Sequence, residues 1–351
     1  MEPQGDTHSI FEHRTVRPSL LSSDLLSDGA NGQLSLDSAS RRFSGYHLRR
    51  AGQTLRRQQA DLALFEAFLG QHSLPCGDLF AGDESWRQVT WQQVETFLQW
   101  QLGEGYAVPT VNVRLSTIKA YARLALQSGL MTPEEYALVR AVQGFTPREQ
   151  RRIDQKRPVV RIGAKKDAPV ALTTQQASAL KSQPGDKPQG RRDALLMCLL
   201  LDHGLRAGEL SALTVEALDL EKGLLRFFRS KVGKEQVHRL SPDALDAARA
   251  YAAFGDMGAE GPLMRRSLKS EKLGEAGLTT RAISQRVNLL GKALGIAHLS
   301  AHDCRHYWAT AAARGGTDPF RLQEAGGWSS LAMPRRYIAE NEIANDGVVL
   351  K

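Results

Sequence analysis

Apolar residues in the first half of the chain recur at the spacing of one face of a helix. The stripes comprise Leu62, Phe65 and Leu69, then Val94, Phe97 and Leu98, and then Val111, Leu115, Ile118 and Ala122. Thr90 and Thr132 are residue types that cap helix N-termini, and Pro109 and Pro133 are typical of a first helical turn. These patterns predict a compact domain of four helices over residues 46–146.

The second half of the chain mixes helical and strand patterns. A capping-box sequence at residues 173–176 precedes an apolar helix that ends at Gly204. Residues 223–230 and 236–241 flank a short polar turn, which predicts a β-hairpin. Further helices are expected over residues 280–294 and 302–314 and in two shorter pieces that end near Tyr337. We therefore expect a mainly α protein of the α+β kind, with its second domain over residues 172–351.

Two segments have little apolar periodicity. Residues 1–45 are rich in Ser, Asp, Gly and Asn, which predicts a disordered N-terminal arm. Residues 145–167 hold eight basic and three acidic residues, a net charge of +5, which predicts an extended basic linker over residues 147–171. Such a linker is either a solvated tether or a strap that lies along a phosphate backbone. For the strap, the candidate contacts are Arg151, Arg152, Lys156 and Arg157.

The composition narrows the choice of partner. The 351 residues carry a net charge of +8 with a pI of about 9.5, which favours nucleic acid or, less often, a membrane surface. The three cysteines are far apart in the sequence, so we expect neither a disulfide framework nor a metal site. The longest apolar run, residues 194–201, is too short to span a bilayer, and the first residues lack the apolar core of a signal peptide. These features predict a cytoplasmic protein.

Two segments of the second half carry side chains suited to phosphate chemistry. Arg206 follows the helix breaker Gly204, and Glu209 lies one helical turn further on, where it can brace a cation. His302 and Arg305 share one face near the start of a helix, and a helix N-terminus itself favours anions. Taken singly, the first pair is better explained by a surface ion pair, and the second by a partly buried histidine beside a solvated arginine.

Two more segments add a tyrosine and a lysine. Tyr337 follows two arginines in a short helix that Pro334 starts, and Trp328 lies upstream behind two glycines. Lys231 lies where the first hairpin strand meets its turn, and Lys234 in the same turn is the competing candidate. A lone tyrosine near a C-terminus is usually a packing residue and a turn lysine is usually solvated, so these residues gain weight only together.

Together these segments resemble the catalytic domain of the tyrosine recombinase (phage integrase) family. The matching residues are Arg206 with Glu209, Lys231 in the hairpin, His302-x-x-Arg305 followed by His306, Trp328, and Tyr337 nine residues beyond the tryptophan. Their order and spacing agree with the family from residue 174 to the C-terminal region. The resemblance implies a site-specific DNA recombinase or integrase, with a catalytic domain over residues 172–351 behind a core DNA-binding domain.

The resemblance also implies how the reaction is divided among the residues. Tyr337 attacks a backbone phosphodiester and forms a 3′-phosphotyrosine, while Arg206 and Arg305 bind the non-bridging oxygens. Trp328 donates one further hydrogen bond, and His302 is the candidate proton acceptor. Lys231 protonates the leaving 5′ oxygen, and Glu209 and His306 have supporting roles. Such chemistry needs neither ATP nor a metal, and we expect no cofactor.

The expected partner is double-stranded DNA that carries recombination sites. Family members act as tetramers on two duplexes through a four-way junction, and DNA-bending accessory proteins are further candidate partners. Three cations of the third predicted helix could contact DNA or form a solvated polar face: Arg114, Lys119 and Arg123. Two alternatives remain: a type IB topoisomerase-like enzyme that relaxes DNA, and a DNA-binding protein without catalysis.

Overall fold

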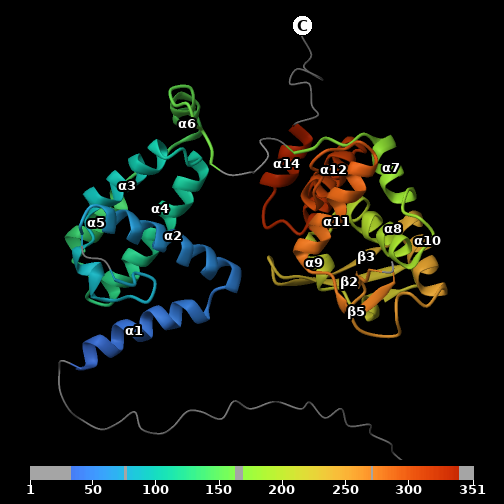
Figure 1. The fold of residues 1–351 in the computed structure, drawn as a ribbon, viewed down its shortest axis with the longest axis horizontal. Coiled ribbons are helices and arrows are strands. Elements are labelled where there is room, and N and C mark those ends of the chain that lie inside the picture. The colour runs from blue at the N-terminus through green and yellow to red at the C-terminus, as the bar shows by residue number, and fades with distance from the viewer. Residues whose placement is uncertain (1–32, 75–76, 163–168, 270–271, 340–351) are drawn as a thin grey trace, which may run out of the picture. The chain divides into compact units, whose positions relative to one another are not determined.

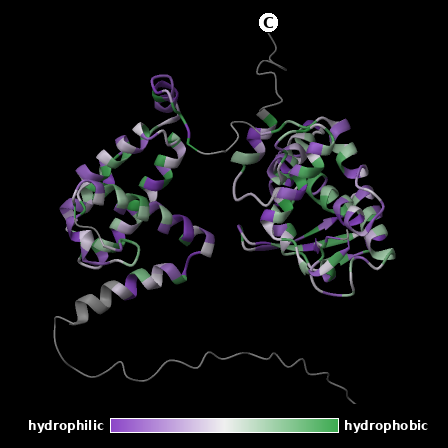
Figure 2. Cartoon of the chain, in the orientation of Figure 1, coloured by the Kyte–Doolittle hydropathy of each residue, from purple (hydrophilic) through white to green (hydrophobic). Residues whose placement is uncertain are grey.

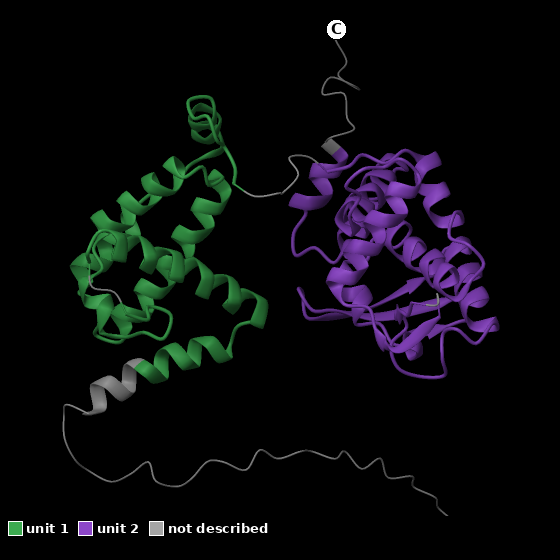
Figure 3. Cartoon of the chain, viewed as in Figure 1, with its two compact units in different colours: residues 1–164 green, residues 165–351 purple. Residues whose placement is uncertain are grey.

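The computed structural model describes residues 33–74, 77–162, 169–269 and 272–339. The chain divides into two compact units, residues 1–164 and 165–351, which are described separately (Figure 3). The boundary falls inside the segment for which the sequence predicts a linker. None of the helices in the described ranges is long and apolar enough to cross a membrane.

Unit 1 is helical and is built around α4 (Figure 1). Its helices are α1 (Gln33–Leu48), α2 (Gly52–Gln71), a 3-10 turn η1 (Glu84–Gln88), α3 (Trp91–Gly103), α4 (Val108–Gln127), α5 (Pro133–Ala141) and α6 (Pro147–Asp154). Helix α4 packs against α1, α2, α3 and α5, and the apolar stripes of the sequence face this shared core. Thr90 forms the capping box of α3 with Gln93, and Thr132 caps α5.

Two segments of unit 1 differ from their expected conformation. Helix α1 begins at Gln33, so the predicted disordered arm does not extend to residue 45; Phe43 is buried at 1% exposure, which holds this helix to the core. Residues 1–32 lie outside the described ranges. The predicted extended linker contains α6, which Thr146 and Glu149 start with a capping box. Helix α6 buries no residue and is mostly hydrophilic (Figure 2), so it offers no apolar stripe to predict it from.

Unit 2 combines helices with two small antiparallel sheets, which confirms the mainly α fold class. Its helices are α7 (Thr174–Ser182), α8 (Pro188–Leu201), α9 (Ala207–Ser211), η2 (Val215–Ala217), α10 (Pro242–Ala253), α11 (Thr280–Ala293), α12 (Ala301–Arg314), α13 (Pro319–Gly326) and α14 (Ala332–Ala339). Its strands are β1 (Leu218–Asp219), β2 (Leu224–Arg229), β3 (Lys234–Arg239), β4 (Arg265–Ser267) and β5 (Leu273–Gly277). Helix α8 is apolar along most of its length and packs against α7, α10 and α12.

The β-hairpin predicted from residues 223–241 is present as β2 and β3. These strands pair antiparallel from Leu224 with Arg239 to Arg229 with Lys234, and β1 extends the sheet on the other side of β2. The second sheet, β4 with β5, was not expected, because its strands are short and carry no alternating apolar pattern. Arg192 on α8 secures β4 through hydrogen bonds to the Arg265 carbonyl and the Ser267 hydroxyl.

Candidate active site

Arg206 lies at the N-terminus of α9, directly behind a tight bend of the chain. Gly204 adopts a φ of +60°, and a side chain there would collide with the ring of Trp308. The Arg206 guanidinium donates to Glu209 Oε1 at 2.7 Å, and its backbone N–H donates to Glu209 Oε2 at 2.8 Å. The Arg206 side chain remains 26% exposed, so it is fixed in place and still open to a ligand.

Glu209 joins two arginines beneath the surface. Its side chain is 4% exposed, and its Oε2 also accepts from the Arg229 guanidinium at 2.8 Å. Burial alone would raise the pKa of Glu209, but the backbone N–H of Arg206 and the charges of both arginines lower it below its ordinary value. Glu209 is therefore ionised and holds Arg206 and Arg229 together.

Arg229 is a member of the site that the sequence pattern did not single out. It ends β2, has no exposed surface and donates to Glu209, to the side-chain oxygen of Gln236 and, at 2.6 Å, to the Ala325 carbonyl. Burial lowers the pKa of Arg229, against the opposing charge of Glu209. The available signal was an arginine at an inward position of a strand that is otherwise apolar on that face.

Arg305 lies on the buried face of α12 at 3% exposure. Its guanidinium donates to the carbonyls of Gly204 and Gly326, and its Cζ atom lies 4.9 Å from the centre of the Trp328 ring. Burial, and then the neighbouring charges of Arg206 and Arg229, lower the pKa of Arg305 to about 9. Arg305 is still protonated at neutral pH, and an anion placed beside it would relieve the repulsion from the other arginines.

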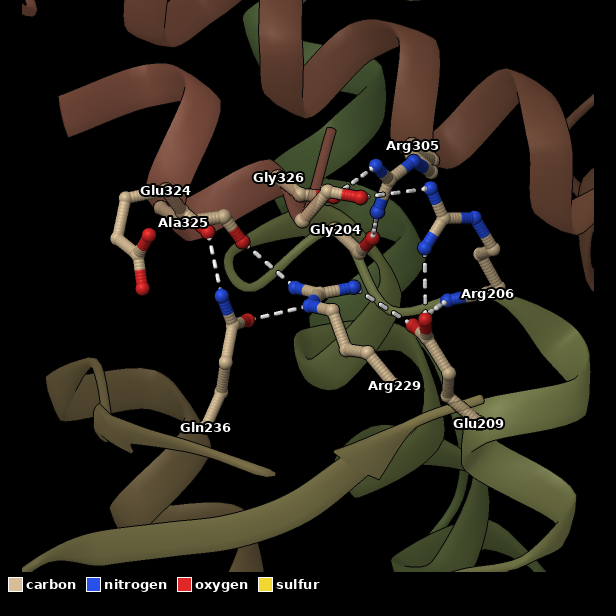
Figure 4. Close-up of polar contacts among 10 residues, drawn as sticks. Gly204, Arg206, Glu209, Arg229, Gln236, Arg305, Glu324, Ala325 and Gly326 are labelled. Carbon is tan, nitrogen blue, oxygen red and sulfur yellow. Dashed lines mark hydrogen bonds and ion pairs between the residues drawn. The ribbon is translucent and has the colours of Figure 1, made fainter. Parts of the chain in front are cut away.

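Four consecutive carbonyls at the end of α13 receive the side chains of this site (Figure 4). The donors to Glu324, Ala325, Gly326 and Gly327 are, in that order, Gln236, Arg229, Arg305 and Arg206. The C-terminal end of a helix carries partial negative charge, which suits a cluster of cations. The same end of α13 thus collects residues from β2, β3, α9 and α12.

Aromatic rings place Tyr337 beside this cluster. Its ring centre lies 5.7 Å from that of Trp328 and 5.0 Å from that of His306, which it meets edge-on. Tyr337 is 3% exposed, so the phenol is covered in this conformation. The arginines, the tryptophan and the tyrosine are therefore brought into one neighbourhood from distant parts of the chain.

His302 and Lys231 occupy the more open positions. His302 is exposed in the first turn of α12, whose N-terminus Ser300 and Asp303 close with a capping box. Lys231 is exposed in the turn between β2 and β3. Lys234, the competing candidate, forms an ion pair with Glu324 at 2.5 Å, which ties it to α13. Lys231 is thus the turn lysine that extends beyond the hairpin strands.

Three of the DNA-contact candidates have structural partners within unit 1. Arg114 bonds to Gln101 and lies over the Tyr106 ring, and Lys119 donates to the carbonyls of Arg140 and Val142. Arg157 bonds to Asp154 and to the carbonyls of Leu102, Tyr106 and Val160. The exposed candidates are Arg123, Arg151, Arg152 and Lys156. These intramolecular bonds favour a structural role for the first three, and DNA contact stays a prediction for all seven.

A second group of basic residues in unit 1 was missed. Three arginine pairs recur along α1, the turn after it and the first half of α2, and all six residues are exposed: Arg41, Arg42, Arg49, Arg50, Arg56 and Arg57. Residues 41–57 contain no acidic residue, so their net charge is +6. The recurrence of the pairs was the signal, and the prediction of a disordered arm hid it. Within the described ranges, no group of His, Cys, Asp and Glu side chains could hold a metal ion.

The cluster of Arg206, Arg305, Trp328 and Tyr337 is accompanied by the fold of a known enzyme class, and the chain is a tyrosine recombinase, which cleaves and rejoins DNA. Residues 171–343 match the phage integrase family, and the chain belongs to this family. It is similar to the tyrosine recombinase XerC of Natranaerobius thermophilus, with 26% identity over 73% of this chain and 80% of the relative.

Solved structures of integrases have the same fold. The Tn1549 transposon integrase in complex with transposon right end DNA matches with a TM-score of 0.59 at 14% identity, over 88% of this chain and 97% of that one. A lambda integrase tetramer bound to a Holliday junction matches with a TM-score of 0.57 at 18% identity, over 88% of this chain and 79% of that one. The family assignment confirms the function class expected from the sequence, a site-specific recombinase.

Proposed function

We propose that Tyr337 is the nucleophile of a site-specific strand exchange and that Arg206 and Arg305 hold the reacting phosphate. The supporting observation is the convergence of both guanidinium groups on the end of α13, with Trp328 beside Arg305 and Tyr337 beside Trp328. Two positive charges at this point stabilise the additional negative charge of a pentavalent phosphorus. The indole N–H of Trp328 supplies one further donor.

Cleavage exchanges one phosphoester bond for another. The phenolic oxygen of Tyr337 bonds to phosphorus, the bond from phosphorus to the 5′ oxygen breaks, and a 3′-phosphotyrosine with a free 5′-hydroxyl results. His302 accepts the phenolic proton, and the ammonium of Lys231 protonates the departing oxygen. Glu209 holds Arg206 in position, and His306 packs against the nucleophile. Because the phosphoester is retained, rejoining needs no energy from ATP.

The burial of Tyr337 adds a requirement to this scheme. At 3% exposure the phenol cannot meet a DNA phosphate in the conformation described. Binding of DNA therefore has to displace α14, which carries Tyr337. The natural partner is duplex DNA with recombination sites, on which four copies of the chain assemble, as in the lambda integrase tetramer bound to a Holliday junction.

The decisive experiment captures DNA that is covalently bound to the protein. Wild-type chain and Tyr337→Phe are expressed in parallel with the DNA of the source cell, and DNA that survives denaturing purification is sequenced. Wild-type protein is expected to hold DNA ends at a defined site, and the variant, which lacks the attacking oxygen, none. A nicked duplex with the recovered site then serves as a suicide substrate in vitro. An adduct formed equally by Tyr337→Phe would show that another residue is the nucleophile.

A further inference from the structure

Arg229 belongs to the β2–β3 hairpin but also contacts two helices outside it. It has no exposed surface, and its guanidinium spans three elements: Glu209 on α9, Gln236 on β3 and the Ala325 carbonyl on α13. Glu209 is itself the partner of Arg206. A buried arginine with an acceptor for each of its three side-chain nitrogens is rigidly held, and its planar group fixes the elements that it joins.

The backbone of Arg229 closes the turn that carries Lys231. The Arg229 carbonyl accepts from the N–H of Val232 at 3.1 Å and from that of Gly233 at 2.9 Å. Lys231 is therefore enclosed between a residue whose carbonyl closes the turn and the strand that begins at Lys234. The side chain of Arg229 is bound to α13 and its backbone closes the turn, so the position of the turn depends on the side-chain contacts of Arg229.

The segment that follows α13 leaves room for the Arg229 side chain because it contains a glycine. Gly327 has a φ of +57°, and a Cβ added there would lie 2.2 Å from Cδ of Arg229. The chain between α13 and Trp328 thus passes over the Arg229 stem at a distance that only a glycine permits. Arg229 consequently joins the hairpin to the segment that carries Trp328.

We propose that Arg229 is a positioning residue that acts through Lys231, an inference that rests on the function proposed above. Arg229 touches neither DNA nor the reacting atoms. It holds the base of the hairpin so that the Lys231 ammonium can reach the 5′ oxygen as that oxygen leaves phosphorus. If the anchor is lost, Lys231 is misplaced, while the phosphate clamp of Arg206 and Arg305 retains its carbonyl partners.

The test compares two leaving groups on the suicide substrate. One duplex carries the natural 5′ oxygen at the scissile bond, and the other carries sulfur there. A thiolate leaves without a proton, so sulfur removes the need for the acid. In Arg229→Lys, which keeps the charge but cannot span three partners, cleavage of the oxygen substrate is expected to fall by roughly 10–100-fold. Cleavage of the sulfur substrate should fall clearly less, because loss of the Arg229–Glu209 pair acts on both substrates and misplacement of Lys231 acts on the oxygen substrate alone.

Unit 2 contains a matched control for structural damage. Arg192 is also fully buried and has the same kinds of partner: the Asp193 carboxylate, the Arg265 carbonyl and the Ser267 hydroxyl oxygen. It secures the β4–β5 sheet rather than the Lys231 hairpin. Arg192→Lys should lower stability in the same manner and leave the ratio of oxygen to sulfur cleavage as in wild type.

The outcomes separate this inference from the proposed function. If wild type forms no adduct with either substrate, the proposed function fails and the inference fails with it. If wild type is active but Arg229→Lys slows both substrates equally, or Arg192→Lys gives the same sulfur rescue, the inference alone is wrong. Failure of sulfur to rescue Lys231→Ala would also overturn it. Should Arg229→Lys not fold, Gln236→Met removes one Arg229 partner, and the inference requires a smaller loss that sulfur likewise restores.

Discussion

The two units use carbonyl-bound cations for different purposes. In unit 1, Arg157 joins α6 to the end of α3 through carbonyl groups, and Lys119 closes the end of α5. In unit 2, Arg206 and Arg305 also bind carbonyls, yet these lie beside a tyrosine and a tryptophan. The comparison teaches that arginines bound to carbonyls indicate an active site only where a nucleophile lies beside them. The positive charge of a residue in the sequence does not by itself distinguish a structural role from a catalytic one.

The largest effect expected from this difference is in the cleavage rate. Arg305→Lys keeps a positive charge but loses the paired donors, and removal of one such donor typically costs about 10²–10³ in rate. Single-turnover cleavage of the suicide substrate at saturating DNA measures this loss. Arg157→Lys in unit 1 is the matched control, because Arg157 also binds main-chain carbonyls. An equal loss of rate in that control would break the distinction between the units.

Much of this site could be predicted because short stretches of sequence indicate where its residues lie. Arg206, His302, Arg305 and Tyr337 each lie at a recognisable helix end or spacing, and the β2–β3 hairpin follows from strand composition around a polar turn. The acceptors could not be predicted, because they are backbone carbonyls of residues 324–327, whose side chains carry no signal. Arg229 escaped for the same reason, since its main partners come from α9 and α13.

The errors in unit 1 have a different physical origin. Helix α6 is held by its capping box and by the bonds of Arg157, and not by an apolar face, so periodicity could not reveal it. Helix α1 has one deeply buried aromatic residue, Phe43, within a polar sequence. The spacing of Lys119 along its helix fits both a solvated lysine and a lysine that binds the end of another helix. The difference lies in the carbonyls of Arg140 and Val142, which the spacing does not reveal.

Acid should destabilise unit 2 more than unit 1. Burial lowers the pKa of His203 and of His238 to about 4, against an ordinary value of 6.5. Between these values the unfolded chain binds more protons than the folded one, so stability falls as the pH falls from 6.5 to 4. Burial instead raises the pKa of Asp61 and Glu66 in unit 1, which has the opposite sign.

Hydrogen exchange of the full chain can follow the two units separately. Amides of α8 and α10 should lose protection over this pH range, after correction for intrinsic rates, more than amides of α3 and α4. His238→Leu removes one titrating group and should recover about 2 kcal/mol of the acid-induced loss. Equal acid sensitivity of both units, or no change in the variant, would contradict the assignment of this loss to the buried histidines.

The smallest effect distinguishes the structural cations of unit 1 from those that remain candidates for DNA contact. Lys119→Met removes two hydrogen bonds at the end of α5 and should cost about 1 kcal/mol of stability. It should leave the salt dependence of DNA binding unchanged if the ammonium of Lys119 stays on the carbonyls of Arg140 and Val142 when DNA binds. Arg123→Gln should do the reverse. Because Arg123 is exposed on α4, loss of one phosphate contact reduces the steepness of log K against log salt by about 0.9.

The stability and the salt dependence are both measurable on the same protein, the first by denaturation and the second by binding titrations across salt concentrations. If Lys119→Met changes the slope and Arg123→Gln does not, the assignments of the two residues are reversed, and intramolecular carbonyl contacts would be no guide to which cations of this unit meet DNA.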